Sequence, residues 1–257
     1  MRPLLFAWGP LRVHGYGFMI ALGGILSFWF LRRRARDVGL KSDEDFWLLV
    51  NAVLIGGFAG GRLLYLAEYT RPFSPEFWRT LVSPSRGFSV FGAFVGVPLG
   101  AWIFCRWTKT PFARILDAIC VMAPFWHVFG RLGCLLAGCC HGRPTKLPWG
   151  LVFRDPGSMV PRMWLGVPLH PTQLIEAALD AFIAAVLYRL FERGGKPGLV
   201  CALYFALYGA LRFGVEFLRG DTAPLAFGLT AAQALGLGLI ASSGVVLAWR
   251  SGCCRSS

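Results

Sequence analysis

One stretch of the sequence places charged side chains at regular intervals among apolar neighbours. Tyr208, Arg212, Glu216 and Arg219 recur at helical spacing, so a helix would carry all four on one face. An ionisable side chain in a membrane helix costs about 2.5–3.5 kcal/mol, so each of these charges requires a reason. We interpret the stripe as a polar face that lines a bundle interior or a cavity. The alternative is an Arg212–Glu216 pair that serves packing alone.

A second buried charge is expected in the apolar segment that ends near residue 136. Arg131, Cys134 and Gly138 share a helical face, and nearby glycines leave room for a head group. A guanidinium donates two parallel hydrogen bonds to phosphate oxygens and keeps its charge at any depth. Arginines on two helices therefore predict a site for a phospholipid phosphate. The alternative is that Arg131 reaches outward to the membrane interface.

Three thiols and an imidazole follow this arginine and lie within a stretch of eight residues. They are Cys134, Cys139, Cys140 and His141. The C-x4-C-C-H spacing is not typical of zinc sites, and adjacent cysteines rarely bind one ion together. We therefore rank a structural or disulfide role first, a catalytic thiol second and a metal third, and we predict neither a metal nor a cofactor. His14, His141 and His170 are candidate bases, because histidine titrates near neutral pH.

Membrane helices must position these side chains. Of the 257 residues, 56% are hydrophobic and only 15% are charged, against about 25% charged in soluble proteins. This composition excludes a soluble enzyme, a disordered chain, a coiled coil and a small disulfide scaffold. We predict an all-α membrane protein with about seven transmembrane helices and a single integral membrane domain, 1–257. The expected spans are 13–31, 46–61, 87–105, 115–136, 171–190, 198–218 and 222–249.

Compact basic clusters predict the orientation. They follow the first, third and fifth expected helices, at 32–36, 106–109 and 189–196. Placing them in the cytoplasm puts the N-terminus outside and a short tail, 250–257, inside. Residues 137–170, between helices four and five, then form a small extracytoplasmic head. The net charge of +13 on so apolar a chain favours anionic lipid over nucleic acid as a partner.

Six motifs follow one another along the chain from about residue 10 to 221. They are His14-Gly15-Tyr16-Gly17, Gly61-Arg62-Leu63-Leu64-Tyr65, Arg86-Gly87-Phe88-Ser89, Gly130-Arg131-x-Gly133 with Gly142-Arg143-x-Thr145 and Leu147-Pro148-Trp149-Gly150, His170-Pro171-Thr172-Gln173-Leu174-Ile175-Glu176, and Tyr208-Gly209-x-x-Arg212-Phe213-x-Val215-Glu216-Phe217-x-Arg219. With these motifs in this order, the chain resembles bacterial prolipoprotein diacylglyceryl transferases.

The resemblance implies a multi-pass enzyme of the bacterial plasma (inner) membrane. Such enzymes move diacylglyceryl from phosphatidylglycerol to the lipobox cysteine of a prolipoprotein signal peptide, so that a thioether forms and glycerol phosphate leaves. Arg131 and Arg212 would hold the lipid phosphate, with Glu216 orienting Arg212. The residues assigned to catalysis are Arg131, Arg212, Glu216, His141 and Tyr16. Those assigned to lipid binding are Arg131, Arg143, Tyr208, Arg62 and Gly142.

The sequence departs from the family pattern at two motifs. The family has histidine within Ser-Phe-His-Gly-Gly, where this chain has Phe91, and its Gly-Asn-x-x-Asn-x-Glu becomes Gly133-Cys134-x-x-Ala137-x-Cys139. We therefore expect a retained phosphate site and altered activation of the thiol, with one of the three histidines as a replacement base. The alternatives are a paralogue that uses the thiols for other lipid chemistry and a non-catalytic phospholipid-binding protein.

Overall fold

The computed structural model describes the whole chain except residues 1–3, 10, 84–86, 223–227 and 254–257. Arg86 of the third motif and Cys254 lie outside the described residues, and so does the end of the predicted tail. Two compact units result from the contacts within the chain. One contains residues 1–30 and 117–257, and the other contains residues 31–116.

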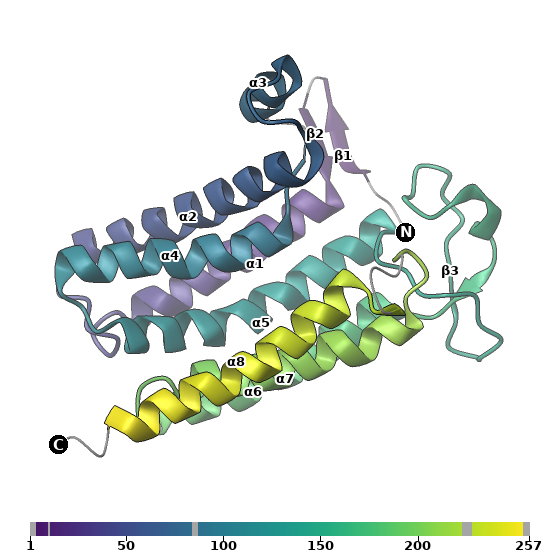
Figure 1. The fold of residues 1–257 in the computed structure, drawn as a ribbon. Helices are drawn as coiled ribbons and strands as arrows, with labels where there is room; N and C mark the ends of the chain where they lie inside the picture. The colour runs from purple at the N-terminus through teal and green to yellow at the C-terminus, as the bar shows by residue number, and fades with distance from the viewer. Residues whose placement is uncertain (1–3, 10, 84–86, 223–227, 254–257) are drawn as a thin grey trace. The chain divides into compact units, whose positions relative to one another are not determined.

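Helices dominate both units (Figure 1). The long ones are α1 (Gly15–Arg33), α2 (Asp43–Tyr69), α4 (Val90–Thr108), α5 (Phe112–Ala137), α6 (Thr172–Glu192), α7 (Leu199–Val215) and α8 (Ala231–Cys253). Within the described residues, six segments are long and apolar enough to cross a membrane: Gly15–Arg33, Asp43–Tyr69, Val90–Thr108, Phe112–Ala137, Leu199–Leu218 and Ala231–Ala248. The prediction of a helical membrane protein is confirmed, and six of the seven predicted spans meet this criterion of length and composition. The remaining long helix, α6, is not among these six segments, because it contains four charged residues: Glu176, Asp180, Arg189 and Glu192.

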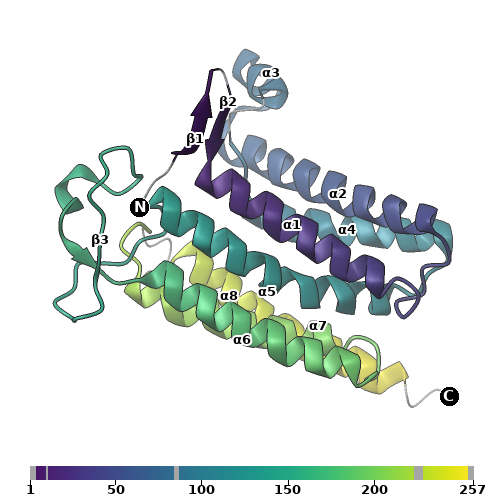
Figure 2. The same cartoon turned by 180° about the vertical axis from the view of Figure 1, so that it is seen from behind.

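Helices α2 and α4 pack closely within the unit 31–116, and both views show them side by side (Figures 1 and 2). Glycines line their contact and let the two backbones approach closely. A Cβ atom at Gly96 would lie only 2.0 Å from the Gly56 carbonyl oxygen. A Cβ at Gly60 would lie 2.4 Å from the carbonyl oxygen of Gly92. Small residues that let two backbones touch are the usual solution for helix pairs in lipid, where burial of apolar surface supplies no driving force.

Replacing Gly96 by alanine is expected to lower the free energy of unfolding by at least about 2 kcal/mol, because the new methyl group must push two backbones apart. Thermal unfolding of the purified protein in detergent measures this. Gly238→Ala is the matched control, because a Cβ there meets nothing within 4 Å. Equal unfolding temperatures for the two variants would contradict the packing described.

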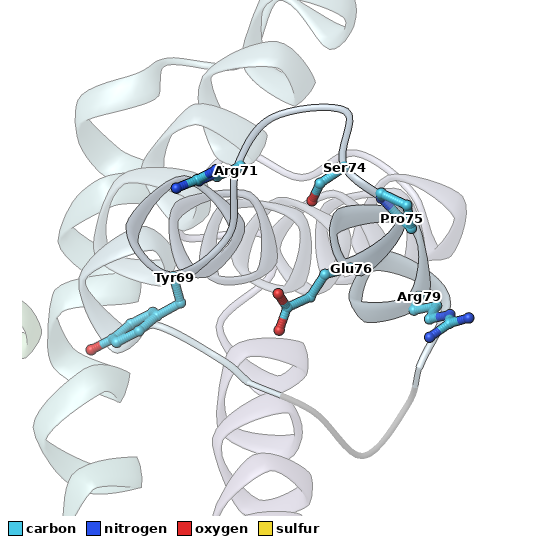
Figure 3. A pocket seen from close by; sticks show the side chains of 6 residues that line it. All are labelled: Tyr69, Arg71, Ser74, Pro75, Glu76 and Arg79. Atoms are coloured by element: carbon cyan, nitrogen blue, oxygen red, sulfur yellow. The ribbon is translucent and has the colours of Figure 1, made fainter.

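The short helix α3 (Pro75–Val82) follows α2 in the same unit. Ser74 caps it by accepting a hydrogen bond from the Phe77 N–H, and Pro75 suits its first turn. An open pocket of about 690 Å³ lies between the end of α2 and α3 (Figure 3). Its lining residues are Tyr69, Arg71, Ser74, Pro75, Glu76 and Arg79. None of them belongs to the site predicted from the sequence.

The other unit begins with a hairpin that the sequence analysis did not predict. Its strands, β1 (Leu4–Trp8) and β2 (Leu11–His14), pair antiparallel. Helix α1 begins directly after them, at Gly15. In this unit α6, α7 and α8 run alongside one another in both views. The first N–H groups of a helix have no partner within it. At the start of α7, the carboxylate of Asp117 on α5 accepts hydrogen bonds from the N–H groups of Gly198 and Cys201. A buried acid in an apolar helix here serves as a cap.

The segment between α5 and α6 forms a small head. It contains β3 (Leu151–Val152), which pairs antiparallel with β4 (Pro168–Leu169), and the short helix η1 (Arg162–Trp164). Phe153, Val160 and Leu169 make its buried core. The predicted head, 137–170, therefore exists as a folded segment, and its side of the membrane remains a prediction.

Candidate active site

Arg131 and Arg212 meet at one carboxylate. Oε2 of Glu176 lies 2.6 Å from Nη2 of Arg131 and 2.7 Å from Nη1 of Arg212. Three helices of one unit supply these side chains: α5, α6 and α7. The Glu176 side chain is fully buried and those of both arginines are largely so. The predicted arginine pair is therefore brought together, and Arg131 turns to this carboxylate rather than outward to an interface.

Two further residues of the predicted stripe extend this cluster. Oε2 of Glu216 lies 3.4 Å from Nη2 of Arg212 and 3.9 Å from Nε of Arg219. Arg219 also donates two hydrogen bonds of 2.9 Å to the carboxylate of Asp221. A turn of 3-10 helix, η2 (Glu216–Leu218), connects these residues to α7. Glu216 does contact Arg212 as predicted, but the shorter ion pair of Arg212 is with Glu176.

The two predicted tyrosines have different surroundings. Tyr208 is buried on α7, with its ring stacked on Tyr204 and 4.8 Å from the ring of His127. Tyr16 is exposed on the first turn of α1. A Cβ on Gly133 would lie 3.2 Å from the Tyr16 Cα, so α1 passes close to α5 two residues after Arg131. Both tyrosines thus belong to the unit that holds the arginines.

Gly142 and Arg143 are held by backbone hydrogen bonds on both sides. The Gly142 N–H donates to the His170 carbonyl at 3.2 Å, and the Arg143 N–H donates to the Leu218 carbonyl at 2.9 Å. Nε of Arg143 donates to the carbonyl of Arg219. Gly142 must be a glycine, because a Cβ would lie 2.4 Å from the His170 Cβ. These residues link the head to the end of α7.

The three candidate bases lie in the same unit. His141 is buried, with Nδ1 at 3.2 Å from the Gly142 carbonyl oxygen and its ring edge-on to Trp164. His170 is partly buried, and its N–H donates to the Arg143 carbonyl. His14 is exposed at the end of β2. Of the three, His141 is the one enclosed beside the loop of thiols.

Cys134 on α5 comes together with Cys139 and Cys140, which follow the end of that helix. Their Sγ atoms lie within 4.8 Å of one another. Cys134, Cys139 and Cys140 are all free thiols, so the disulfide, one of the two roles ranked first from the sequence, is not formed in the structure. Hydrogen bonds from the thiols of Cys134 and Cys139, helped by the positive charges of Arg219 and Arg131, hold the pKa of Cys140 well below its ordinary value.

Arg62 lies in the unit 31–116, on α2, and has backbone partners there. Its guanidinium donates to the carbonyl oxygen of Gly87 at 2.6 Å and also to those of Thr80 and Ser83. The side chain is buried. This arginine therefore ties the segment after α3 to α2, and its assignment to lipid binding stays a prediction.

Sequence reasoning overlooked Glu176 and Asp221 as members of the site. Glu176 is the acid that joins Arg131 to Arg212, and Asp221 holds Arg219. Glu176 could have been recognised, because it is an acidic residue inside an apolar segment and belongs to one of the six motifs. Asp221 carried no such signal, because it follows the end of the helix.

Comparison with known proteins tests the resemblance drawn from the six motifs. The family model of prolipoprotein diacylglyceryl transferase matches residues 3–249. The chain belongs to this family. The match extends over nearly the whole sequence, including the two motifs in which this chain departs from the family pattern.

Among the relatives named phosphatidylglycerol–prolipoprotein diacylglyceryl transferase are three that cover most of this chain. The protein of Clostridium tetani is 35% identical over 86% of this chain and 86% of its own length. The protein of Cupriavidus metallidurans is 31% identical, covering 96% of this chain and 92% of its own. The protein of Azotobacter vinelandii is 34% identical, covering 96% of this chain and 93% of its own. Family membership is therefore supported along the full length of the chain.

Proposed function

We propose that this protein is a transferase that moves diacylglyceryl from phosphatidylglycerol to the lipobox cysteine thiol of a prolipoprotein in a bacterial membrane. The observation that carries the proposal is the pair Arg131 and Arg212, which converges on Glu176 from two other helices. Family membership supplies the substrate class, and this geometry supplies a site that fits its phosphate.

The arginine cluster suits the departure of a phosphate. Each guanidinium has five N–H donors, and Glu176 occupies one Nη of each. The donors that neither Glu176 nor Glu216 engages can therefore bind phosphate oxygens, while Glu176 holds the two guanidinium groups close together. When the bond between the glycerol carbon and the phosphate breaks, negative charge grows on the leaving oxygen. Fixed cations in a water-poor site stabilise that charge without reorganising.

The remaining assignments complete the proposed site. Tyr16 and Tyr208 line it, Arg143 and Gly142 position the head beside the lipid, and His141 serves as the candidate base. Each belongs to the same unit as the arginine cluster. Glu216, which follows Arg212 by one helical turn, orients its guanidinium.

For the membrane topology, we propose that α6 is the seventh transmembrane helix. The two acids in its first half, Glu176 and Asp180, are fully buried, whereas Leu179 and Phe182 are exposed. An apolar outer face with charges turned inward suits a helix that contacts lipid. With seven spans, the basic clusters place the N-terminus outside, the C-terminus in the cytoplasm and the head outside the plasma membrane. That the chain forms one integral membrane domain stays a prediction.

A transfer assay with purified protein tests the function. Phosphatidylglycerol labelled in its diacylglyceryl part is incubated with a lipobox peptide, and we expect a thioether-linked lipid on the peptide together with released glycerol phosphate. A peptide with serine in place of the lipobox cysteine is the control and should stay unmodified. Folded protein that binds the lipid and yields no product would instead support a non-catalytic phospholipid-binding role.

A further inference from the structure

The three thiols at the end of α5 have nearly the spacing of metal ligands. The Sγ atoms of Cys134, Cys139 and Cys140 all lie within 4.8 Å of one another. In a tetrahedral site with Zn–S bonds of ~2.3 Å, two sulfur atoms stand about 3.8 Å apart. Side-chain rotations that move each sulfur by about 1 Å or less would complete such a site. No rearrangement of helices is needed.

The backbone explains how two adjacent cysteines face the same point. Gly138, at φ +81°, ends α5, and Cys140 itself adopts a positive φ of 57°. This turn prevents the alternation of neighbouring side chains that an extended strand would produce. The carbonyl of Cys139 accepts a hydrogen bond of 2.9 Å from Gln173, and that of Cys140 accepts one of 2.7 Å from Thr172. The loop is thus held in place by fully buried side chains of α6.

The cluster offers an ion three protein ligands. In the part of the chain that the structure describes, no histidine or carboxylate belongs to the same group. Structural zinc sites have four protein ligands, whereas catalytic sites have three and keep the fourth position for water or substrate. A metal bound by this cluster would therefore keep one position for an external ligand.

The cluster adjoins the arginine site through two helices. Arg131 precedes Cys134 by three residues on α5 and so shares its helical face. On α6, Gln173 holds the thiol loop, and one turn later Glu176 holds both Arg131 and Arg212. The thiol cluster and Arg131 therefore lie on successive turns at the end of α5, and successive turns of α6 hold each of them.

We propose that Cys134, Cys139 and Cys140 bind a zinc ion whose open fourth position takes the acceptor cysteine of the prolipoprotein. This inference rests on the proposed function, because it states how that site activates the substrate thiol. A thiol that coordinates zinc loses its proton, here to water. The sulfur then attacks the glycerol carbon that bears the phosphate: the S–C bond forms, the C–O bond breaks, and its electron pair leaves with glycerol phosphate.

Metal content is the first test. The full chain is purified in detergent with a phosphine reductant, loaded with Zn²⁺ and desalted, and we expect one zinc per molecule. Cys134→Ala, Cys139→Ala and Cys140→Ala should each weaken zinc binding at least about tenfold. Cys105→Ala is the matched control, because Cys105 is a buried free thiol of α4. Folded wild-type protein that retains no zinc would overturn the inference.

The open position is tested with Co²⁺ in place of zinc. Its visible absorption bands report the number of thiolate ligands. We expect a lipobox peptide to change these bands and its serine analogue to leave them unaltered. A spectrum that the cysteine peptide does not change would make the site purely structural and overturn the proposed role.

Activity separates this inference from the proposed function. Removal of zinc with a chelator should lower the rate of transfer about 100-fold, and added Zn²⁺ should restore it. Unchanged transfer by metal-free protein would overturn the zinc inference and leave the proposed function intact. Zinc-loaded protein that coordinates the peptide and forms no thioether would contradict the proposed function and support the zinc site.

Discussion

Replacing Arg212 by alanine is expected to lower the rate of diacylglyceryl transfer by at least about 1,000-fold, because the leaving phosphate loses one of its two fixed cations. The same change leaves the carboxylates of Glu176 and Glu216 buried without this partner. Breaking a buried ion pair in this way costs about 3–5 kcal/mol, so thermal unfolding must be measured beside the rate.

Arg212→Lys separates the two effects. An ammonium keeps the positive charge but cannot donate as a planar fork toward Glu176 and Glu216 at once. We expect this variant to fold and still to lose about 100-fold in rate. Arg189→Ala is the control, because Arg189 is exposed on the last turn of α6. A well-folded Arg212→Lys protein with the wild-type rate would refute the role of the guanidinium.

Replacing Glu176 by glutamine is expected to lower kcat by about 10- to 100-fold without raising the KM for phosphatidylglycerol. Glutamine has the same shape but lacks the charge that holds Arg131 and Arg212 together. The freed guanidinium groups keep their attraction for a phosphate, so binding of the lipid in its ground state survives. Their alignment with the leaving oxygen does not.

Steady-state kinetics with varied phosphatidylglycerol measure this division between kcat and KM. Glu176→Asp keeps the charge and shortens the side chain by one methylene, so we expect an intermediate kcat. Glu192→Gln at the exposed end of the same helix is the control. A higher KM with an unchanged kcat would show that Glu176 serves lipid binding alone.

The sequence was sufficient to predict the arginines and insufficient to predict their partner. Arg131 and Arg212 stand out because a charge in an apolar segment is costly, and such costs can be recognised one residue at a time. Pairing across helices depends on which faces meet, and nothing in the spacing within one helix specifies that. Glu176 was therefore visible as an anomaly of its helix, while its position between two arginines was not.

The thiols show the same limit at the level of the backbone. Their proximity in the sequence predicted a set, but the rule that adjacent cysteines diverge assumes an ordinary backbone. Cys140 has a positive φ, which cannot be predicted from its being a cysteine. Likewise, the expected span ended at 61 because a charged residue, Arg62, follows. Helix α2 continues to Tyr69, since the buried Arg62 guanidinium donates to backbone carbonyls such as that of Gly87.

The head is joined to the helices mainly through its own main chain. Within residues 142–145, backbone N–H groups donate hydrogen bonds to the carbonyls of His170 and Pro168 on one side and of Leu218 on the other. The Gly220 N–H donates to the carbonyl of His141. Main-chain bonds of this kind do not depend on side-chain identity. The loop beside the arginines can therefore exchange one set of reactive groups for another while the phosphate site keeps its shape.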